Sequence, residues 1–346
     1  MSVVEVLARC GGRAGWGELT QHVTSHRIRR ALATGEIVRL ARDVYALPSL
    51  GPAELAAARV RGVLCLESAA AHWGLATWGP PGPTAVAVPR GATPSPWPDV
   101  TYRWCELSAE ELADGRTALL RTVLDCAALL PLPKALAVAD SALRDGHLVR
   151  ARLVQAAAEL HGPGRARRLR VVRAADGRAD NPFESALRGT LIQGGIRGFE
   201  PQVVVRAPGL DAQVDLGHRG HRIAIEAEGF AYHGATARAF NRDCRRYDEL
   251  VRHGWRVLRF TWQHVMEQPE WVVEVVRTTQ PAATRTTQVR RTGCHQARSG
   301  SRHELCRCCC GATCRRRRRR RTSSRGSRSC RRSGCRAAAP RRPGRC

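Results

Sequence analysis

Residues 211–228 read DAQVDLGHRGHRIAIEAE and predict two β-strands joined by a turn at Arg219 and Gly220. Because successive residues of a strand point to opposite faces, one face of this hairpin is expected to be apolar and the other acidic. The expected apolar face consists of Val214, Leu216, Ile223, Ile225 and Ala227. The expected acidic face carries Asp215, Glu226 and Glu228. The hairpin therefore gathers three carboxylates on one side of a sheet.

The length of the turn decides which acids meet. With the longer of two possible turns, His218 pairs with Ile223, and Asp215 lies opposite Glu226 with Cβ atoms roughly 5 Å apart. A tighter turn would instead place Asp211 opposite Glu226, with the same facing. Either register brings an acid from each strand to close range.

Like charges at this distance destabilise a sheet unless a cation lies between them. Mg²⁺ prefers carboxylate oxygens, keeps several waters and shares its shell with substrate phosphate. We therefore predict a Mg²⁺ or Mn²⁺ site, serving phosphodiester chemistry, that is built by Asp215, Glu226 and Glu228. The alternative is that these acids only form the solvated face of an edge strand.

Three segments around this hairpin lie in a recognisable order. They are IEAEGFAYH at 225–233, NRDCRRYDEL at 241–250 and GWRVLRFT at 254–261. Together with Asp215 they resemble the very-short-patch-repair-like endonucleases of the restriction-endonuclease-like PD-(D/E)XK superfamily, over roughly residues 175 to 280.

The resemblance implies a mixed sheet flanked by helices, with Asp215 and Glu226 as ligands of a divalent metal. Glu228 occupies the position at which many superfamily members have a lysine. An acid there can bind metal, but it cannot give the attacked phosphate a positive charge.

Two further residues are candidates for the same site. Glu184 follows Asn181 and Pro182 at the capping-box position of a predicted helix, and capping alone would explain it. The resemblance also makes Glu184 an accessory metal ligand, and the two roles can coexist. His233 follows the acidic strand and could orient or deprotonate a water or contact phosphate, although a loop histidine often does neither.

A basic helix is predicted downstream of His233. One face would carry Arg242, Arg245 and Arg246. The other face would carry Tyr247, Leu250 and Val251. The arginines could bind the phosphate backbone of DNA, or they could form an ordinary solvated face.

Residues 1–50 predict three helices followed by a hairpin. The helices are expected near residues 3–7, 16–22 and 25–34, and the hairpin strands at 37–40 and 44–47. This is the element order of a winged helix-turn-helix. The third helix would present Arg27, Arg29 and Arg30 to a DNA groove or its phosphates, and the alternative is a protein-contact domain.

A second resemblance covers four segments of the N-terminal part. They are RIRRAL at 27–32, VRLARDVYAL at 38–47, ESAAAHWGL at 67–75 and RTVLD at 121–125. They resemble the AbiEi-type antitoxins, transcriptional regulators that are paired with nucleotidyltransferase toxins. Asp43 replaces the glycine that is usual in the hairpin turn, and aspartate tolerates a positive φ next best.

The middle of the chain has no catalytic spacing. Residues 51–150 predict a small α/β unit with strands at 84–88 and 100–104 between helices. Residues 151–178 predict a helix and then a basic linker, which leads to the nuclease-like domain at 179–280. The expected fold class is therefore a multidomain α/β (α+β) protein.

Positive charge and cysteine concentrate at the C-terminal end. Of the net charge of +27, residues 282–346 account for +20, because they contain 21 Arg and one acid. The segment 281–346 also holds nine of the 14 cysteines and cannot build an apolar core, so we predict a disordered Arg/Cys-rich tail. GC-rich DNA translated in a wrong frame would give such a string, and the alternatives are a nucleic-acid-binding tail or a zinc site.

Composition also bounds the setting of the protein. Five scattered cysteines in residues 1–281 are typical of a reducing cytoplasm. No run of about 18 apolar residues occurs, so we expect a cytoplasmic protein without a membrane segment. The moderate positive excess of the same residues favours an anionic partner such as DNA.

Two functional hypotheses follow. The first is a Mg²⁺-dependent DNA endonuclease that holds its metal with Asp215 and Glu226 and docks the duplex with its N-terminal winged helix. The second is a non-catalytic DNA-binding regulator of the antitoxin type, with a cognate toxin as its partner.

Overall fold

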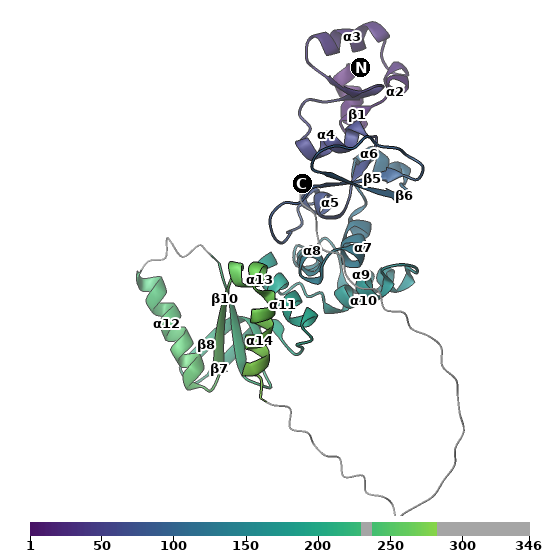
Figure 1. The fold of residues 1–346 in the computed structure, drawn as a ribbon. Helices are drawn as coiled ribbons and strands as arrows, with labels where there is room; N and C mark the ends of the chain where they lie inside the picture. The colour runs from purple at the N-terminus through teal and green to yellow at the C-terminus, as the bar shows by residue number, and fades with distance from the viewer. Residues whose placement is uncertain (230–236, 282–346) are drawn as a thin grey trace, which may run out of the picture. The chain divides into compact units, whose positions relative to one another are not determined.

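Three β-sheets and the helices around them make up the described part of the chain, which comprises residues 1–229 and 237–281 of 346 (Figure 1). The structure is a computed structural model. It confirms the predicted mixed α/β fold class with several sheets. In these residues no helix is both long enough and apolar enough to span a membrane.

The N-terminal region combines three helices with a small sheet. Its elements are α1 (Val3–Arg9), β1 (Arg13–Ala14), α2 (Trp16–Thr20), α3 (Ser25–Ala33), β2 (Val38–Ala41) and β3 (Val44–Ala46). The helices share one core cluster that includes Leu7, Leu19 and Ile28. The sheet has the order β1-β3-β2, so β1 adds a strand that the sequence did not predict. Asp43, in the β2–β3 turn, has a φ of 59°.

A second small sheet follows. Its region contains α4 (Pro52–Arg59), β4 (Val63–Leu64), α5 (Leu66–His72), β5 (Thr84–Pro89), β6 (Val100–Cys105) and α6 (Ala109–Asp114). The strand order is β4-β5-β6, and β5 and β6 are parallel. The sequence predicted β5 and β6 but missed β4 and α6, which are only 2 and 6 residues long.

Four helices connect this region to the last sheet. They are α7 (Leu119–Leu129), α8 (Leu132–Arg144), α9 (Arg150–Glu159) and α10 (Arg165–Ala174). The sequence predicted a basic linker in place of α10. The structure corrects this, because α10 buries Val171 and Val172 in a core cluster shared with Leu136 and Leu153. The linker was predicted because the many arginines of this segment make its composition strongly basic, although one face of the helix is apolar.

The C-terminal region is a four-stranded mixed sheet. Its elements are α11 (Pro182–Gln193), β7 (Glu200–Ala207), β8 (Leu210–His218), β9 (Ile223–Glu228), α12 (Ala237–Arg252), β10 (Arg256–Thr261), α13 (Trp262–Glu267) and α14 (Pro269–Thr279). The strand order is β10-β9-β8-β7. Strands β7, β8 and β9 are antiparallel neighbours, whereas β10 is parallel to β9. Helix α12 is therefore the crossover between two parallel strands.

Two core clusters lie against this sheet. One contains Leu216, Ile225 and Phe260 together with residues of α11, α13 and α14. The other contains Val214 and Ala224 together with Leu250 of α12. Helices thus flank the mixed sheet, as Figure 1 also shows for α12 and α14. The prediction that Val214 shares an apolar face with Leu216 is wrong, because the two residues belong to different clusters.

An irregular residue of the neighbouring strand lies beside this change of face. Gln202 of β7 has a φ of 54°, in the left-handed region that non-glycine residues rarely adopt. The register of β7 and β8 places Asp215 across from Gln202. The left-handed backbone of Gln202 thus lies at the level of the sheet at which Val214 and Leu216 change clusters.

Candidate active site

The β8–β9 hairpin brings the predicted acids together. His218 pairs with Ile223, which is the register expected for the longer turn. The ladder between the two strands ends just before Asp215, whose Oδ2 atom accepts a hydrogen bond from the backbone N–H of Ala227 at 2.7 Å. The Asp215 side chain thus takes the place of a main-chain acceptor and is held beside Glu226.

Glu226 is almost fully buried, with 4% of its surface exposed. Its Oε1 atom accepts a hydrogen bond from Nη1 of Arg246 on α12 at 2.9 Å. Burial, and after it the charge of Asp215, raise the pKa of Glu226 to about 8, although Arg246 opposes this rise. Burial raises the pKa of Asp215 as well. Two carboxylates that resist carrying charge together therefore share one site.

Glu228 is oriented by α12 and β10. The hydroxyl of Tyr247 donates to Oε1 of Glu228 at 2.9 Å, and Nε of Arg259 donates to the same oxygen at 2.6 Å. The guanidinium of Arg259 also lies 4.7 Å from the centroid of the Tyr247 ring. Glu228 is therefore held by a charge-assisted hydrogen bond from Arg259 and a hydrogen bond from the hydroxyl of Tyr247.

Glu184 lies in the first turn of α11, which Asn181 caps, and forms no capping box, but it also contacts Gln202 of the sheet. Its Oε1 atom accepts from the amide of Asn181 at 2.7 Å, and its Oε2 atom accepts from the backbone of Asp180 at 3.0 Å and from Gln202 at 2.7 Å. Burial is the main cause that raises the pKa of Glu184 to about 7, and the charge of Asp215 adds to it. Glu184 is thus within electrostatic reach of the strand acids.

The donor set of Asp215 and Glu226 fits a divalent cation with oxygen ligands. Burial raises the pKa of both carboxylates, and the charge of Asp215 raises that of Glu226 further, so a dication would favour the charged form of both. Within residues 1–229 and 237–281, no three His, Cys, Asp or Glu side chains are grouped so as to hold a metal by themselves. The pair would therefore depend on water and substrate oxygens for the rest of the coordination shell.

The remaining predicted residues have other surroundings. Five of the six predicted DNA-binding arginines are exposed: Arg27, Arg29 and Arg30 on α3, and Arg242 and Arg245 on α12. The sixth, Arg246, turns inward to Glu226. Val251 was expected to pack on the inner face of this helix, but it is 58% exposed. His233 lies outside the described residues, and its catalytic role stays a prediction.

Sequence reasoning missed Gln202 and Arg259. Gln202 donates to Glu184 and accepts from Gln213, which links α11 to β7 and β8. Arg259 pairs with Glu226 in the parallel register of β9 and β10. The alternation of residues 256–261 predicts a strand with Arg259 on one of its faces. The register that brings Arg259 to the acids, however, is set only by the crossover through α12.

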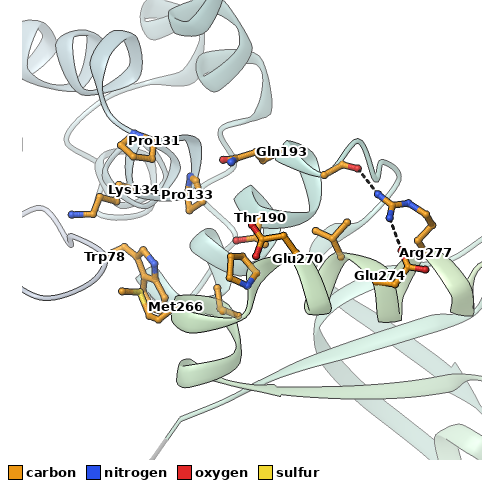
Figure 2. A pocket seen from close by; sticks show the side chains of 14 residues that line it. Trp78, Pro131, Pro133, Lys134, Thr190, Gln193, Met266, Glu270, Glu274 and Arg277 are labelled. Carbon is orange, nitrogen blue, oxygen red and sulfur yellow. Dashed lines mark hydrogen bonds and ion pairs between the residues drawn. The ribbon is translucent and has the colours of Figure 1, made fainter. Parts of the chain in front are cut away.

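A separate cavity of about 690 Å³ lies between the start of α8 and the helices α11 and α14 (Figure 2). Apolar residues such as Trp78, Met266 and Val273 line it, and an ion pair of 2.7 Å between Arg277 and Glu274 lies at its margin. The strand acids do not line this cavity. It is therefore not part of the candidate active site.

The C-terminal region matches a known protein family. Residues 183–279 match the family model REase_MTES_1575, which is restriction-endonuclease-like. The matched span begins in α11, ends in α14 and includes the whole four-stranded sheet with its acids. This part of the chain is therefore similar to restriction endonucleases, which indicates a nuclease domain.

Two curated relatives come from Mycobacterium tuberculosis. They are the uncharacterized protein MT2308 of strain CDC 1551 / Oshkosh and the uncharacterized protein Rv2248 of strain ATCC 25618 / H37Rv. Each is 31% identical over 155 residues, which cover 44% of this chain and 57% of the relative. The chain thus spans little more than half the length of these relatives.

One solved structure is also similar in part. It is the crystal structure of the RV2827C protein from Mycobacterium tuberculosis, with 16% identity and a TM-score of 0.30. The alignment covers 60% of this chain and 87% of that chain.

Proposed function

We propose that this protein is a metal-dependent DNA endonuclease whose active site is built around Asp215 and Glu226. The observation that carries the proposal is that two carboxylates from adjacent strands, Asp215 and Glu226, lie together in a restriction-endonuclease-like domain, where burial raises the pKa of both and the charge of Asp215 raises that of Glu226 further. Folding alone does not require such a pair, because burial disfavours the charged form of both acids. Perturbed carboxylates of this kind concentrate at functional sites.

In this proposal Mg²⁺ or Mn²⁺ is held by Asp215 and Glu226, with Glu228 as a third acid close by. When bound, the cation would polarise the phosphate and activate a water molecule for hydrolysis. Glu184, whose pKa is about 7, would be partly protonated near neutral pH in the free protein and would lose that proton when positive charge enters the site. Asp215 keeps its bond to the backbone of Ala227, which fixes its direction.

The N-terminal region would dock the duplex. We assign residues 1–50 as a winged helix-turn-helix whose α3 places Arg27, Arg29 and Arg30 against phosphates or base edges. The exposed positions of these three arginines support this assignment. Arg242 and Arg245, which are exposed on α12, would contact the DNA backbone near the site of cutting.

A second candidate function is a non-catalytic DNA-binding regulator of the AbiEi antitoxin type, acting with a cognate toxin. The pairing of Glu226 with Arg246 and of Glu228 with Arg259 favours it, because two acids already have positive partners within the chain. The nuclease proposal has the stronger support, because Asp215 adds a third negative charge that these arginines do not pair with directly.

A plasmid-nicking assay tests the proposal. The full-length wild type should cut supercoiled DNA with Mg²⁺ or Mn²⁺, and D215N should lower the rate at least about a thousandfold while DNA binding persists. The matched control is D211N, because Asp211 lies on the same strand with its side chain 74% exposed. If wild type and D211N bind the plasmid but leave it intact, the regulator is the correct function.

A further inference from the structure

Arg246 is held in the acidic group by several contacts. Its Nη1 atom donates to Oε1 of Glu226 at 2.9 Å and to the backbone oxygen of Gln213 at 3.1 Å. Its Nη2 atom donates to the hydroxyl of Tyr247 at 3.2 Å, and the guanidinium lies 4.8 Å from the centroid of the Tyr247 ring. The guanidinium is therefore fixed in place rather than free in solvent.

Arg252, on the same helix, has a different setting. Arg252 is 64% exposed and pairs with Glu249 one turn away, which is an ordinary surface ion pair. Arg246 is only 28% exposed and reaches two strands of the sheet. Among the described side chains of α12, the position of Arg246 therefore points to a role at the acids.

The guanidinium of Arg246 keeps capacity for one more acceptor. A guanidinium has five N–H donors, one on Nε and two on each Nη. The Nε atom of Arg246 lies 4.0 Å from Oδ1 of Asp243. Both donors of Nη1 are used by Glu226 and Gln213, whereas Tyr247 takes one of the two on Nη2. Within the described residues the second Nη2 donor has no acceptor, and the side chain is open to solvent over about a quarter of its surface, 28%.

A phosphodiester that approaches Asp215 and Glu226 meets negative charge. A positive charge that is already fixed beside the acids lowers this repulsion, and it needs no rearrangement as charge builds up on the phosphate oxygens. Arg246 supplies such a charge next to Glu226. Its planar fork can contact an acid and a phosphate oxygen at the same time.

We propose that Arg246 is a catalytic residue of the nuclease: its second Nη2–H group donates to a non-bridging oxygen of the phosphodiester that is cut. This inference rests on the proposed function and names the group that neutralises the reacting phosphate. In the hydrolysis a bond forms between the water oxygen and phosphorus, one P–O ester bond breaks, and the proton of the water passes to the leaving oxygen. Arg246 keeps all its protons during this step.

The same geometry gives Glu228 a role. Glu228 accepts from Tyr247 and from Arg259, and Tyr247 in turn accepts from Arg246. Glu228 and Tyr247 are therefore positioning residues, which keep the guanidinium of Arg246 over the ring and directed at the acids. Y247F, which lacks the connecting hydroxyl, should lower kcat about tenfold and leave KM nearly unchanged.

The main test uses R246A, R246K and the control R252A in the full-length protein. In single-turnover cleavage R246A should be slower by a factor of about 10²–10³, whereas R246K should lose less because it keeps the charge without the fork. R252A should cut like the wild type. DNA affinity, measured by fluorescence anisotropy without metal, should change less than about threefold in R246A, because many other contacts contribute to binding.

Chemical rescue separates catalysis from a structural role. Added methylguanidinium should raise the cleavage rate of R246A and leave that of the wild type unchanged. If the wild type cuts DNA and R246A cuts equally fast, or R246A is slow and methylguanidinium restores nothing, the inference on Arg246 is overturned and the proposed function stands. If the wild type and R252A bind DNA but cut none, the proposed function fails and this inference with it.

Discussion

Two carboxylate–arginine pairs in this chain have similar contacts and different surroundings. Asp140 of α8 and Arg188 of α11 lie 2.7 Å apart, with side chains that are 0% and 5% exposed. Glu226 and Arg246 lie 2.9 Å apart, with side chains that are 6% and 28% exposed. The first pair joins two helices in the interior. The second lies on a sheet, beside the further carboxylate of Asp215.

The difference is one of charge balance. Asp140 also accepts from the backbone N–H of Asp176 at 2.7 Å, and Arg188 also donates to the backbone of Ala174 at 2.5 Å, so one negative charge meets one positive charge. Burial raises the pKa of Asp140 as well as that of Glu226. Around Glu226 the negative charges outnumber the arginine, and the charge of Asp215 adds to the effect of burial, so that the pKa of Glu226 rises to about 8. A buried ion pair with equal charges has a structural role. A partly exposed group with excess negative charge carries an unfavourable electrostatic free energy, which a bound cation can reduce.

The largest expected effect is on the balanced pair. D140A should destabilise the protein by about 3–5 kcal/mol, because Arg188 would remain buried without its partner. Urea denaturation followed by tryptophan fluorescence measures this change. The control D211N removes an exposed acid and should stay within about 0.5 kcal/mol of the wild type. If D140A lowers the free energy of unfolding by less than about 1 kcal/mol, the Asp140–Arg188 pair does not have the structural role that distinguishes it from the Glu226–Arg246 pair.

Metal binding should distinguish the unbalanced pair. Mn²⁺ at 100 times its Kd should stabilise the wild type by about 2.7 kcal/mol, because the ion binds the folded acids. D215N and E226Q should show little of this stabilisation, while D211N should retain it. Calorimetric titration and thermal melts with and without Mn²⁺ provide the measurement. Absence of Mn²⁺ uptake by the wild type would remove the basis for the nuclease proposal.

The smallest expected effect concerns pH. The folded-state pKa values of Glu226 and Glu184 are about 8 and about 7, both above the ordinary value of 4.5. Their contribution to stability is therefore complete below about pH 4.5 and is lost as pH rises through 7 and 8. In the metal-free protein, D215N removes the charge that raises both pKa values. Its free energy of unfolding should therefore rise relative to that of the wild type by about 1 kcal/mol between pH 5 and 8.5.

Urea midpoints across this pH range would measure the effect. D211N is again the control, and its stability should follow that of the wild type at each pH. A constant difference between D215N and the wild type would mean that Asp215 does not act electrostatically on the two glutamates.

Much of the C-terminal sheet could be predicted because its signals are local. The turn at Arg219–Gly220 and the strand alternation on either side left two registers open, and the structure has the one of the longer turn, which pairs His218 with Ile223. Asn181 likewise predicted the start of α11, where its side chain accepts from the backbone N–H of Glu184. Strand β4 could not be predicted, because two residues are too short for a periodic signal.

The change of face near Asp215 could not be predicted either. It occurs beside the positive φ of Gln202, and glutamine is not a residue type that indicates such a conformation. The buried face of α10 was hidden for another reason, because its two valines are surrounded by arginines in the sequence. Burial there is decided by the helices that pack against it.

The sequence by itself determined that acids from two adjacent strands would come together, because a short turn sets the register of a hairpin. Only the tertiary structure decided which positive charges meet those acids. Arg246 arrives on the crossover helix and Arg259 on the parallel strand after it. Their positions depend on how α12 packs on the sheet through Leu250, and contacts so distant along the chain leave no local pattern in the sequence.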